Sequence, residues 1–376
     1  MGLIYFDNAA TTSLHPEVLQ AMLPYFENKF GNPSAIHSFG RETRIAIENA
    51  RKQVSNLLGA HTSEIFFTSC GTESTNTIFN SAINDLKCER IISTAIEHHA
   101  TLYNCIKSEK ANVELINVNL NEEGFVDYNH LEELLSSSSK KTLVSLMHAN
   151  NEVGNLLDIE KVGDLCEKYN AYFHSDMVQT IGHLPIDFSK NKVHFASASA
   201  HKFHGPKGSG LLFKRNDIEL KPFILGGGQE RNMRAGTENV AGIVGFSTAL
   251  KIAIDNMNED SNYIKSLRNE LATKLKLHFQ DVTFLTSVNE STLFTVLNIG
   301  FPLNNKTEML LMNLDINGIA VSGGSACTSG SQGASHVLKA IYPNKNFVPI
   351  RFSFSKLNTQ NEIEKTIEVL KKILNN

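Results

Sequence analysis

The chain is organised around the segment Ser199-Ala200-His201-Lys202, which follows the apolar run Val193-His194-Phe195-Ala196. An apolar run that ends in small and polar residues is typical of a buried strand with functional side chains at its carboxyl end. Lysine forms imines only as a neutral amine, which near neutrality requires a pKa of about 7–8 in place of roughly 10.4. Most lysines lie at the surface, so Lys202 alone is also compatible with an ordinary exposed turn.

A second strand end makes a chemical role for Lys202 more specific. The segment Tyr172-Phe173-His174-Ser175-Asp176 has the pattern of a buried strand and ends in an acid. The ring of pyridoxal phosphate (PLP) requires two protein anchors, a lysine that forms the Schiff base and an acid beside the ring nitrogen. Lys202 and Asp176 together therefore predict a PLP site.

Length and composition indicate a soluble globular protein. The chain has 376 residues, of which 41% are hydrophobic and 20% charged. The net charge of −4 argues against a general nucleic-acid binder. No apolar run approaches the roughly 18 residues of a membrane span, and the N-terminus does not resemble a signal peptide. The five cysteines are widely spaced, which favours a reducing cytoplasm over a disulfide framework.

Short apolar runs alternate with helical patterns from about residue 60 to residue 215. This alternation predicts an α/β fold with a mostly parallel sheet. Five polar side chains follow predicted strands: Thr72, His98, Asn151, Asp176 and Lys202. Because the carboxyl ends of parallel strands meet at one edge of a sheet, we expect these five side chains to lie together.

From about residue 256 the regular alternation of strands and helices stops. The helical stretches and short strands that follow predict a smaller α+β domain. We expect a large cofactor-binding domain over residues 14–255. The small domain would combine residues 1–13 with residues 256–376.

The segment Ser69-Cys70-Gly71-Thr72-Glu73-Ser74 has the pattern of a strand end, a glycine turn and a helix start. Backbone N–H groups at such a start bind anions, and a threonine hydroxyl adds a donor. The same residues also fit an ordinary helix N-terminus. Neither His98 with His99 nor His201 with His204 has the geometry or the third ligand of a metal site, so no metal is predicted.

A cysteine-bearing segment at about residues 321–333 contains the run Val321-Ser322-Gly323-Gly324-Ser325-Ala326-Cys327-Thr328-Ser329-Gly330. Almost all of these residues are small, so we expect the segment to be mobile. A structural cysteine usually lies among apolar neighbours, and Cys327 does not. A free thiol has a pKa of about 8.5, so a reactive role requires a nearby base or positive charge. A flexible surface loop with an incidental cysteine has the same composition.

Ten stretches carry a resemblance to a known family. They are Asp7-Asn8-Ala9-Ala10-Thr11-Thr12, Gly31-Asn32-Pro33-Ser34, Thr72-Glu73-Ser74, Glu97-His98, Asn150-Asn151-Glu152, Asp176-Met177-Val178-Gln179, Ser199-Ala200-His201-Lys202, Arg234-Ala235-Gly236-Thr237-Glu238-Asn239, Ser325-Ala326-Cys327-Thr328-Ser329 and Arg351-Phe352-Ser353. In their order and spacing they resemble the NifS/IscS-type cysteine desulfurases, within aminotransferase class V. The resemblance implies a homodimeric PLP enzyme of fold type I. Met177 departs from the family pattern, in which a smaller residue is common.

The resemblance implies roles for the residues around the cofactor ring. Lys202 would hold PLP as a Schiff base, and Asp176 would pair with the pyridine nitrogen. Gln179 would contact the ring oxygen O3′. His98 would stack on the ring and assist proton transfer, and Cys327 would accept the sulfur.

The resemblance also implies which residues hold the phosphate and the substrate. The phosphate would be held by Gly71, Thr72, Ser199 and His201, with Thr237 reaching in from the second subunit. Asn151 would lie beside both cofactor and substrate. Arg351 would bind the substrate carboxylate with help from Asn32.

The implied activity is PLP-dependent removal of sulfur from L-cysteine, which gives L-alanine and a persulfide on Cys327. The sulfur would pass to an iron-sulfur scaffold protein or another acceptor in the cytoplasm. A selenocysteine lyase or another class V PLP enzyme is an alternative on the same fold. A non-catalytic sulfur-relay protein is a second alternative, against which the presence of both Lys202 and Asp176 argues.

Overall fold

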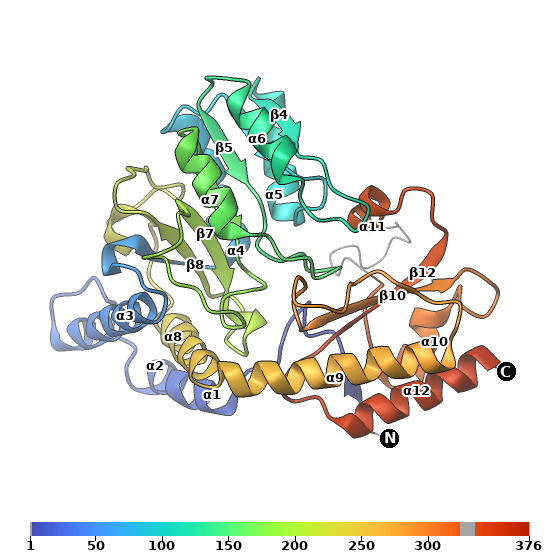
Figure 1. Cartoon of the computed structure of the whole chain (residues 1–376). Helices are drawn as coiled ribbons and strands as arrows, with labels where there is room; N and C mark the ends of the chain where they lie inside the picture. Colours follow the sequence, from blue (N-terminus) through green and yellow to red (C-terminus); the bar gives the residue numbers. More distant parts are fainter. Residues whose placement is uncertain (1, 324–334, 376) are drawn as a thin grey trace.

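The computed structural model describes residues 2–323 and 335–375 and has the α/β fold that the sequence predicts. The described chain forms two lobes, and the long helix α9 (Met257–His278) leads from the larger lobe into the smaller one (Figure 1). Residues 324–334, with Cys327 and most of the predicted cysteine-bearing segment, lie outside the described residues.

A seven-stranded sheet forms the centre of the large lobe. Its strands are β2 (Ile65–Thr68), β3 (Arg90–Ser93), β4 (Glu114–Asn117), β5 (Thr142–Ser145), β6 (Tyr172–Asp176), β7 (Phe195–Ser199) and β8 (Gly210–Lys214). Their order is β2-β8-β7-β6-β5-β3-β4. Only β8 runs antiparallel to its neighbours, so the sheet is mostly parallel, as predicted.

Helices cover both faces of this sheet. They are α1 (Pro16–Met22), α2 (Pro24–Glu27), α3 (Ser38–Leu57), α4 (Gly71–Asn84), α5 (His99–Lys110), α6 (Tyr128–Ser136), α7 (Ile159–Lys168) and α8 (Val240–Asp255). Alternate strand residues serve the two faces: Ile65 and Phe67 pack in one hydrophobic core, whereas Phe66 packs in the other. This burial on both faces explains why the strands read as continuous apolar runs.

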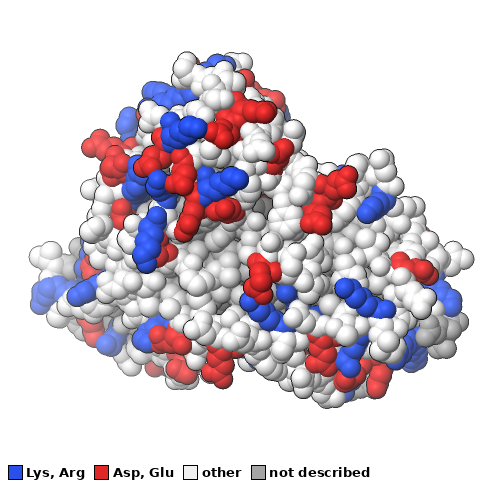
Figure 2. Space-filling model, in the orientation of Figure 1, with Lys and Arg blue, Asp and Glu red and all other residues white. Residues whose placement is uncertain are grey.

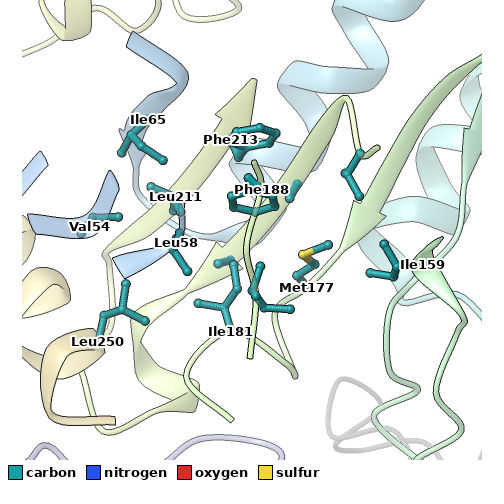
Figure 3. Packing of buried hydrophobic residues seen from close by; sticks show 14 of the residues in the cluster. Val54, Leu58, Ile65, Ile159, Met177, Ile181, Phe188, Leu211, Phe213 and Leu250 are labelled. Carbon is teal, nitrogen blue, oxygen red and sulfur yellow. The ribbon is translucent and has the colours of Figure 1, made fainter. Parts of the chain in front are cut away.

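The larger core is tightly packed around residues of the central sheet and its neighbouring helices (Figure 3). The rings of Phe188 and Phe213 stack with centroids 3.8 Å apart and an interplanar angle of 8°. Met177 is fully buried in this core near Ile181, although it directly follows Asp176. Its side chain therefore fills the core, and the departure from the family pattern is a packing substitution.

The small lobe has its own core around an antiparallel sheet of order β12-β10-β9. These strands are β12 (Phe347–Ser353), β10 (Val296–Pro302) and β9 (Thr283–Phe284), packed with α9, α10 (Leu310–Ile316) and α12 (Gln360–Asn375). Helix α11 (His336–Ile341) packs in a separate cluster with Ile96 and Val153. The first strand, β1 (Ile4–Tyr5), pairs in parallel with β11 (Ile319–Ala320) and so belongs to this lobe. The predicted domain limits stay a prediction.

Two helix ends follow local sequence signals. Helix α12 begins with a capping box, in which Thr359 N–H donates to Glu362 Oε2 (2.7 Å) and Glu362 N–H donates to Thr359 Oγ1 (3.3 Å). Helix α3 ends before Gly59, which has a φ of +61°. Helix α3 begins at Ser38, but apolar residues at helical spacing start only at Ile45. The first turns of the helix show no such spacing because they are largely exposed and lack an apolar stripe.

Positive and negative side chains are interspersed over the face shown in Figure 2. Among the described residues, no single helix is long and apolar enough to cross a membrane. Helices α8 and α9 meet such a length and composition criterion only as a pair, and they are bent by 73°.

Candidate active site

The carboxyl ends of the parallel strands open into a cavity of about 260 Å³ between the two lobes. All five polar side chains predicted at strand ends line it: Thr72, His98, Asn151, Asp176 and Lys202. Five other predicted site residues line it as well: Gly71, Gln179, Ser199, His201 and Arg351. The lining also includes Ala9, Ala10, Cys70, Ala100, Met147 and Val178.

Lys202 lies in a short 3-10 turn directly after β7, and its ammonium group is directed to the N-terminal segment. Its Nζ donates hydrogen bonds to the carbonyl oxygens of Ala9 (2.6 Å) and Ala10 (2.8 Å). Gln179 Nε2 donates to the same Ala9 oxygen (3.1 Å). The lysine amine and the Gln179 amide are thereby held at one wall of the cavity.

Asp176 ends β6 beside Lys202 and is almost fully buried. Burial raises the pKa of its carboxyl, while His98, the Val178 N–H and Lys202 oppose that rise. The Val178 N–H donates to Asp176 Oδ1 over 3.0 Å, which fixes the orientation of the carboxyl group. A buried acid of this kind fits the nitrogen of a pyridine ring, because the two groups can share a proton.

The start of α4 forms an anion cradle at one end of the cavity. Cys70 is the N-cap, and its side chain makes no capping hydrogen bond within the described part of the chain. Ser199 Oγ accepts from the Gly71 N–H (2.7 Å), so the serine hydroxyl hydrogen remains available to a ligand. A Cβ atom at residue 71 would lie 2.5 Å from Val178 Cγ2, so only glycine fits there. These features suit a phosphate group.

His201 stands beside the anion cradle as a neutral side chain. Burial, together with Lys202 and Lys207, lowers the pKa of its imidazole to about 4. Its Nδ1 lies 3.1 Å from Thr11 Oγ1, with which it shares a hydrogen bond. The neutral ring can donate to a phosphate oxygen without adding charge to the cradle.

His98 serves as the N-cap of α5 as well as lining the cavity. Its Nδ1 accepts the N–H of Ala100 (3.1 Å), and burial lowers the pKa of the imidazole. The ring is therefore neutral with its proton on Nε2, and it presents a hydrogen-bond donor to the cavity. A role for His98 as a base requires the capping hydrogen bond to open. The adjacent His99 stacks on Tyr103 (5.3 Å, 12°) outside the cavity lining.

Arg351, on β12, is a buried cation at the small-lobe side of the cavity. It pairs with Asp7 Oδ1 (2.8 Å) and donates to the Asn151 carbonyl oxygen (2.8 Å). Its Nε is buried and has no hydrogen-bond partner among the described residues. An unsatisfied guanidinium N–H at a cavity wall is a donor for a carboxylate ligand.

Two predicted site residues lie elsewhere in the described chain, outside the lining of this cavity. Thr237 is exposed and borders a separate groove, and Asn32 is exposed with its Oδ1 accepting the Ser34 N–H (2.9 Å). Cys327 lies outside the described residues. The roles of these three residues stay predictions.

Several residues near the site could not be assigned from residue types alone. The run Asp7–Thr12 is polar and small and predicts only extended chain, yet Asp7, Ala9, Ala10 and Thr11 all contact cavity residues. Only the family resemblance, in which this run is one of the matching motifs, indicated that it belongs to the site.

The donor set fits PLP: a lysine, a buried acid and a glycine-based anion cradle line one cavity, next to a buried arginine. The described residues contain no group of three or more His, Cys, Asp or Glu side chains that could hold a metal ion.

Comparison with known proteins agrees with this geometry. The family model for aminotransferase class-V matches residues 4–366. The chain is 41% identical over 375 residues to "Cysteine desulfurase IscS" of Dictyoglomus turgidum, covering 99% of this chain and 94% of that protein. It is 40% identical over 373 residues to "Cysteine desulfurase NifS" of Azotobacter vinelandii, covering 98% and 91%. A solved structure of a "NIFS-LIKE PROTEIN" superposes with a TM-score of 0.92 at 37% identity, covering 99% of both chains. The chain therefore belongs to aminotransferase class V, among the cysteine desulfurases of the IscS and NifS type.

Proposed function

We propose that this chain uses PLP to transfer the sulfur of L-cysteine to Cys327, releasing L-alanine and leaving a persulfide. The atoms balance, because the substrate sulfur passes to the Cys327 thiol and L-cysteine without its sulfur is L-alanine. The observation that carries the proposal is the placement of Lys202, Asp176 and Arg351 on one cavity. The cysteine desulfurase names of its relatives support the choice of substrate.

Each side chain of the cavity has a place in this reaction. When bound, PLP supplies an aldehyde for imine formation and a ring that accepts electrons. Asp176 would hold the ring nitrogen, and the α4 cradle with Ser199 would hold the phosphate. His98 would cover the ring and donate a hydrogen bond from Nε2. Lys202 would take the Cα proton of the substrate on Nζ, which the Ala9 and Ala10 carbonyl oxygens orient.

The substrate carboxylate is assigned to Arg351. Its Nε–H has no acceptor among the described residues, and a carboxylate oxygen of the substrate would accept that hydrogen bond. The ion pair with Asp7 keeps the guanidinium in place. Asn151 lies at the same wall, since its carbonyl oxygen already accepts from Arg351. Asn32 lies outside this cavity in its own chain, so a contribution to the substrate site would come from a second subunit.

A homodimer completes the proposed site. Thr237 is exposed at the surface and would reach the phosphate of the partner subunit. Near Asn32, large apolar side chains are exposed on α2 (Phe26), in the loop that follows it (Phe30) and on α3 (Phe39). An apolar surface of this kind suits burial against a second copy.

An iron-sulfur scaffold protein is the proposed sulfur acceptor, and the cytoplasm the proposed compartment. The names of the relatives support sulfur transfer without identifying the acceptor. Cys70, Cys88, Cys105 and Cys166 are free thiols, which is consistent with a reducing compartment.

The test is the formation of L-alanine from L-cysteine by purified protein, together with the absorbance of bound PLP. Lys202→Ala should lose both the Schiff-base absorbance and turnover. Lys207→Ala is the matched control, because Lys207 is an exposed lysine five positions away that does not line the cavity. Colourless protein that ignores added PLP would contradict the proposal. Parallel assays with L-selenocysteine separate it from a selenocysteine lyase.

A further inference from the structure

We infer that three charged residues on α3, Arg44, Glu48 and Arg51, are positioning residues that set how Thr237 is presented to the phosphate site of a partner subunit. They act on the presentation loop, defined as residues 226–239. This inference rests on the proposed function, in which Thr237 contributes to the cofactor site of a second copy. It adds residues that do not touch the cofactor and that lie far from Thr237 in the sequence.

The charges of α3 and of the presentation loop alternate in a matching order. Arg44 NH1 lies 3.0 Å from Glu238 Oε1. Arg231 NH2 lies 2.8 Å from Glu48 Oε2, and Arg51 pairs with Glu230 at 2.8 and 2.7 Å. Residues 44, 48 and 51 share one face of a helix. A shift of the loop along this face would place like charges together, so the ion pairs specify one register.

The pair of Arg51 and Glu230 is the buried anchor of this arrangement. Both side chains are almost fully buried and bond through two parallel contacts. Arg51 NH1 also donates to the Ile65 carbonyl oxygen (2.7 Å), and Glu230 Oε2 accepts the Phe67 N–H (2.8 Å). The loop is thereby attached to strand β2, which leads directly into the anion cradle at Gly71. Removing one partner would leave a buried charge unpaired.

The loop backbone adopts a conformation that requires such support. Glu230, Arg231 and Asn232 have φ values of 42°, 57° and 65°, and none of them is glycine. Consecutive non-glycine residues in the left-handed region are unfavourable and persist only where surrounding contacts enforce them. Two of the three side chains, Glu230 and Arg231, bind the α3 charges. The ion pairs therefore hold a turn that the backbone alone would not keep.

Beyond this turn the loop is fixed on both sides of Thr237. Arg234 bonds to both Glu73 oxygens (3.0 and 3.3 Å), and Glu73 lies in the first turn of α4. Glu238 is buried and paired with Arg44, whereas Thr237 is exposed. Thr237 thus projects from a backbone that is attached to its own anion cradle. The position of this hydroxyl relative to a partner's cradle is set within each subunit.

The test is a double-mutant cycle on PLP affinity, measured by absorbance titration of the full-length protein. Glu230→Gln removes one charge of the buried pair with little change in shape, and Arg44→Gln removes the partly exposed charge that pairs with Glu238. We expect PLP to bind about tenfold more weakly to the first variant and about threefold more weakly to the second. In a Thr237→Ala background both effects should shrink to less than about twofold, because the positioned group is absent.

Arg215→Gln is the matched control, because it breaks the exposed Arg215–Asp217 pair away from the loop. It should leave PLP affinity unchanged. The inference is overturned if the α3-loop variants bind PLP as the parent does, or if their effects persist undiminished without Thr237, which would indicate a general structural role. A parent protein that does not bind PLP would overturn the proposed function together with this inference. A parent that binds PLP normally and variants without coupling would overturn the inference alone.

Discussion

Arg351 and Asp7 form an ion pair of 2.8 Å although they stand 344 positions apart in the sequence. The pair is part of a junction in which the N-terminal segment runs beside β12. Ser353 N–H donates to the Phe6 carbonyl oxygen, and Asn8 Nδ2 donates to Ser353 O. Residues 6–8 and 351–353 thereby lie side by side at the wall of the cavity where the substrate carboxylate is proposed to bind.

Replacing Asp7 should weaken substrate binding while leaving the cofactor in place. In Asp7→Asn the guanidinium of Arg351 loses its charged partner and its fixed orientation. We expect the KM for L-cysteine to rise about tenfold, or about 1.4 kcal/mol, with the absorbance of bound PLP unchanged. Asp260→Asn, which breaks the Lys356–Asp260 pair outside the cavity, is the control for steady-state kinetics. An unchanged KM in Asp7→Asn would refute the positioning role.

The two functions of His98 can be separated by two substitutions. Its Nδ1 caps α5, and its ring is proposed to cover the cofactor. His98→Asn retains a capping acceptor, whereas His98→Ala does not, so only the alanine variant should lose about 1 kcal/mol of stability. Both should lower kcat by about 100-fold, because neither supplies the ring. Thermal unfolding and turnover are the two measurements, and parental turnover by His98→Asn would rule out a catalytic ring.

Glu97 gives the stability of the protein a specific pH dependence. Burial raises the pKa of its carboxyl from 4.5 to about 8, and its Oε2 has no partner among the described residues. Between these two pH values the folded protein binds one more proton than the unfolded chain. This carboxyl therefore lowers the free energy of unfolding as the pH rises from about 4.5 to about 8.

Glu97→Gln should remove this contribution, because glutamine resembles the protonated acid. Urea unfolding at about pH 5.5 and about pH 8.5 should show the variant gaining stability over the parent at the higher pH, on the order of 3 kcal/mol. Glu290→Gln, an exposed glutamate, is the control. A difference between variant and parent that is the same at both pH values would show that Glu97 does not titrate in this range.

An alanine at residue 71 should be tolerated only if Val178, which contacts this position in the fold, is made smaller. The Cβ atom of Gly71→Ala would meet Val178 Cγ2 at 2.5 Å and displace the start of α4 from the anion cradle. We expect PLP to bind at least about tenfold more weakly. Val178→Ala in the same chain makes room, so the double variant should regain most of that affinity. Equal PLP affinity in the parent and the single variant would remove Gly71 from the cradle.

The strand ends could be predicted because local sequence marks them. β6 matches the predicted strand Tyr172–Asp176, since a short apolar run ends there in polar residues. Parallel pairing then brings Asp176 and Lys202 to one edge, as the α/β pattern implies. These local signals account for most of the cavity lining.

Contacts that depend on tertiary packing carried no such local signal. Asp7 reaches Arg351 through its parallel bridge to Ser353 on β12. In the sequence, the charged residues of α3 look like an ordinary solvent-exposed helix face, and only the folded presentation loop shows their partners. The start of α3 also lacks the apolar stripe that would mark a helix. Long-range pairing, which residue spacing does not encode, decides both features.

The most direct test of the central claim is peptide-mapped mass spectrometry after incubation with L-cysteine. The account predicts that Cys327 gains one sulfur atom, that L-alanine forms in parallel, and that Lys202→Ala shows neither change. Cys70→Ala should still place the sulfur on Cys327, although Cys70 is the one described cysteine that lines the cavity. Sulfur found on Cys70 instead, or L-alanine formed by the parent and by Cys327→Ala at equal rates, would contradict the account.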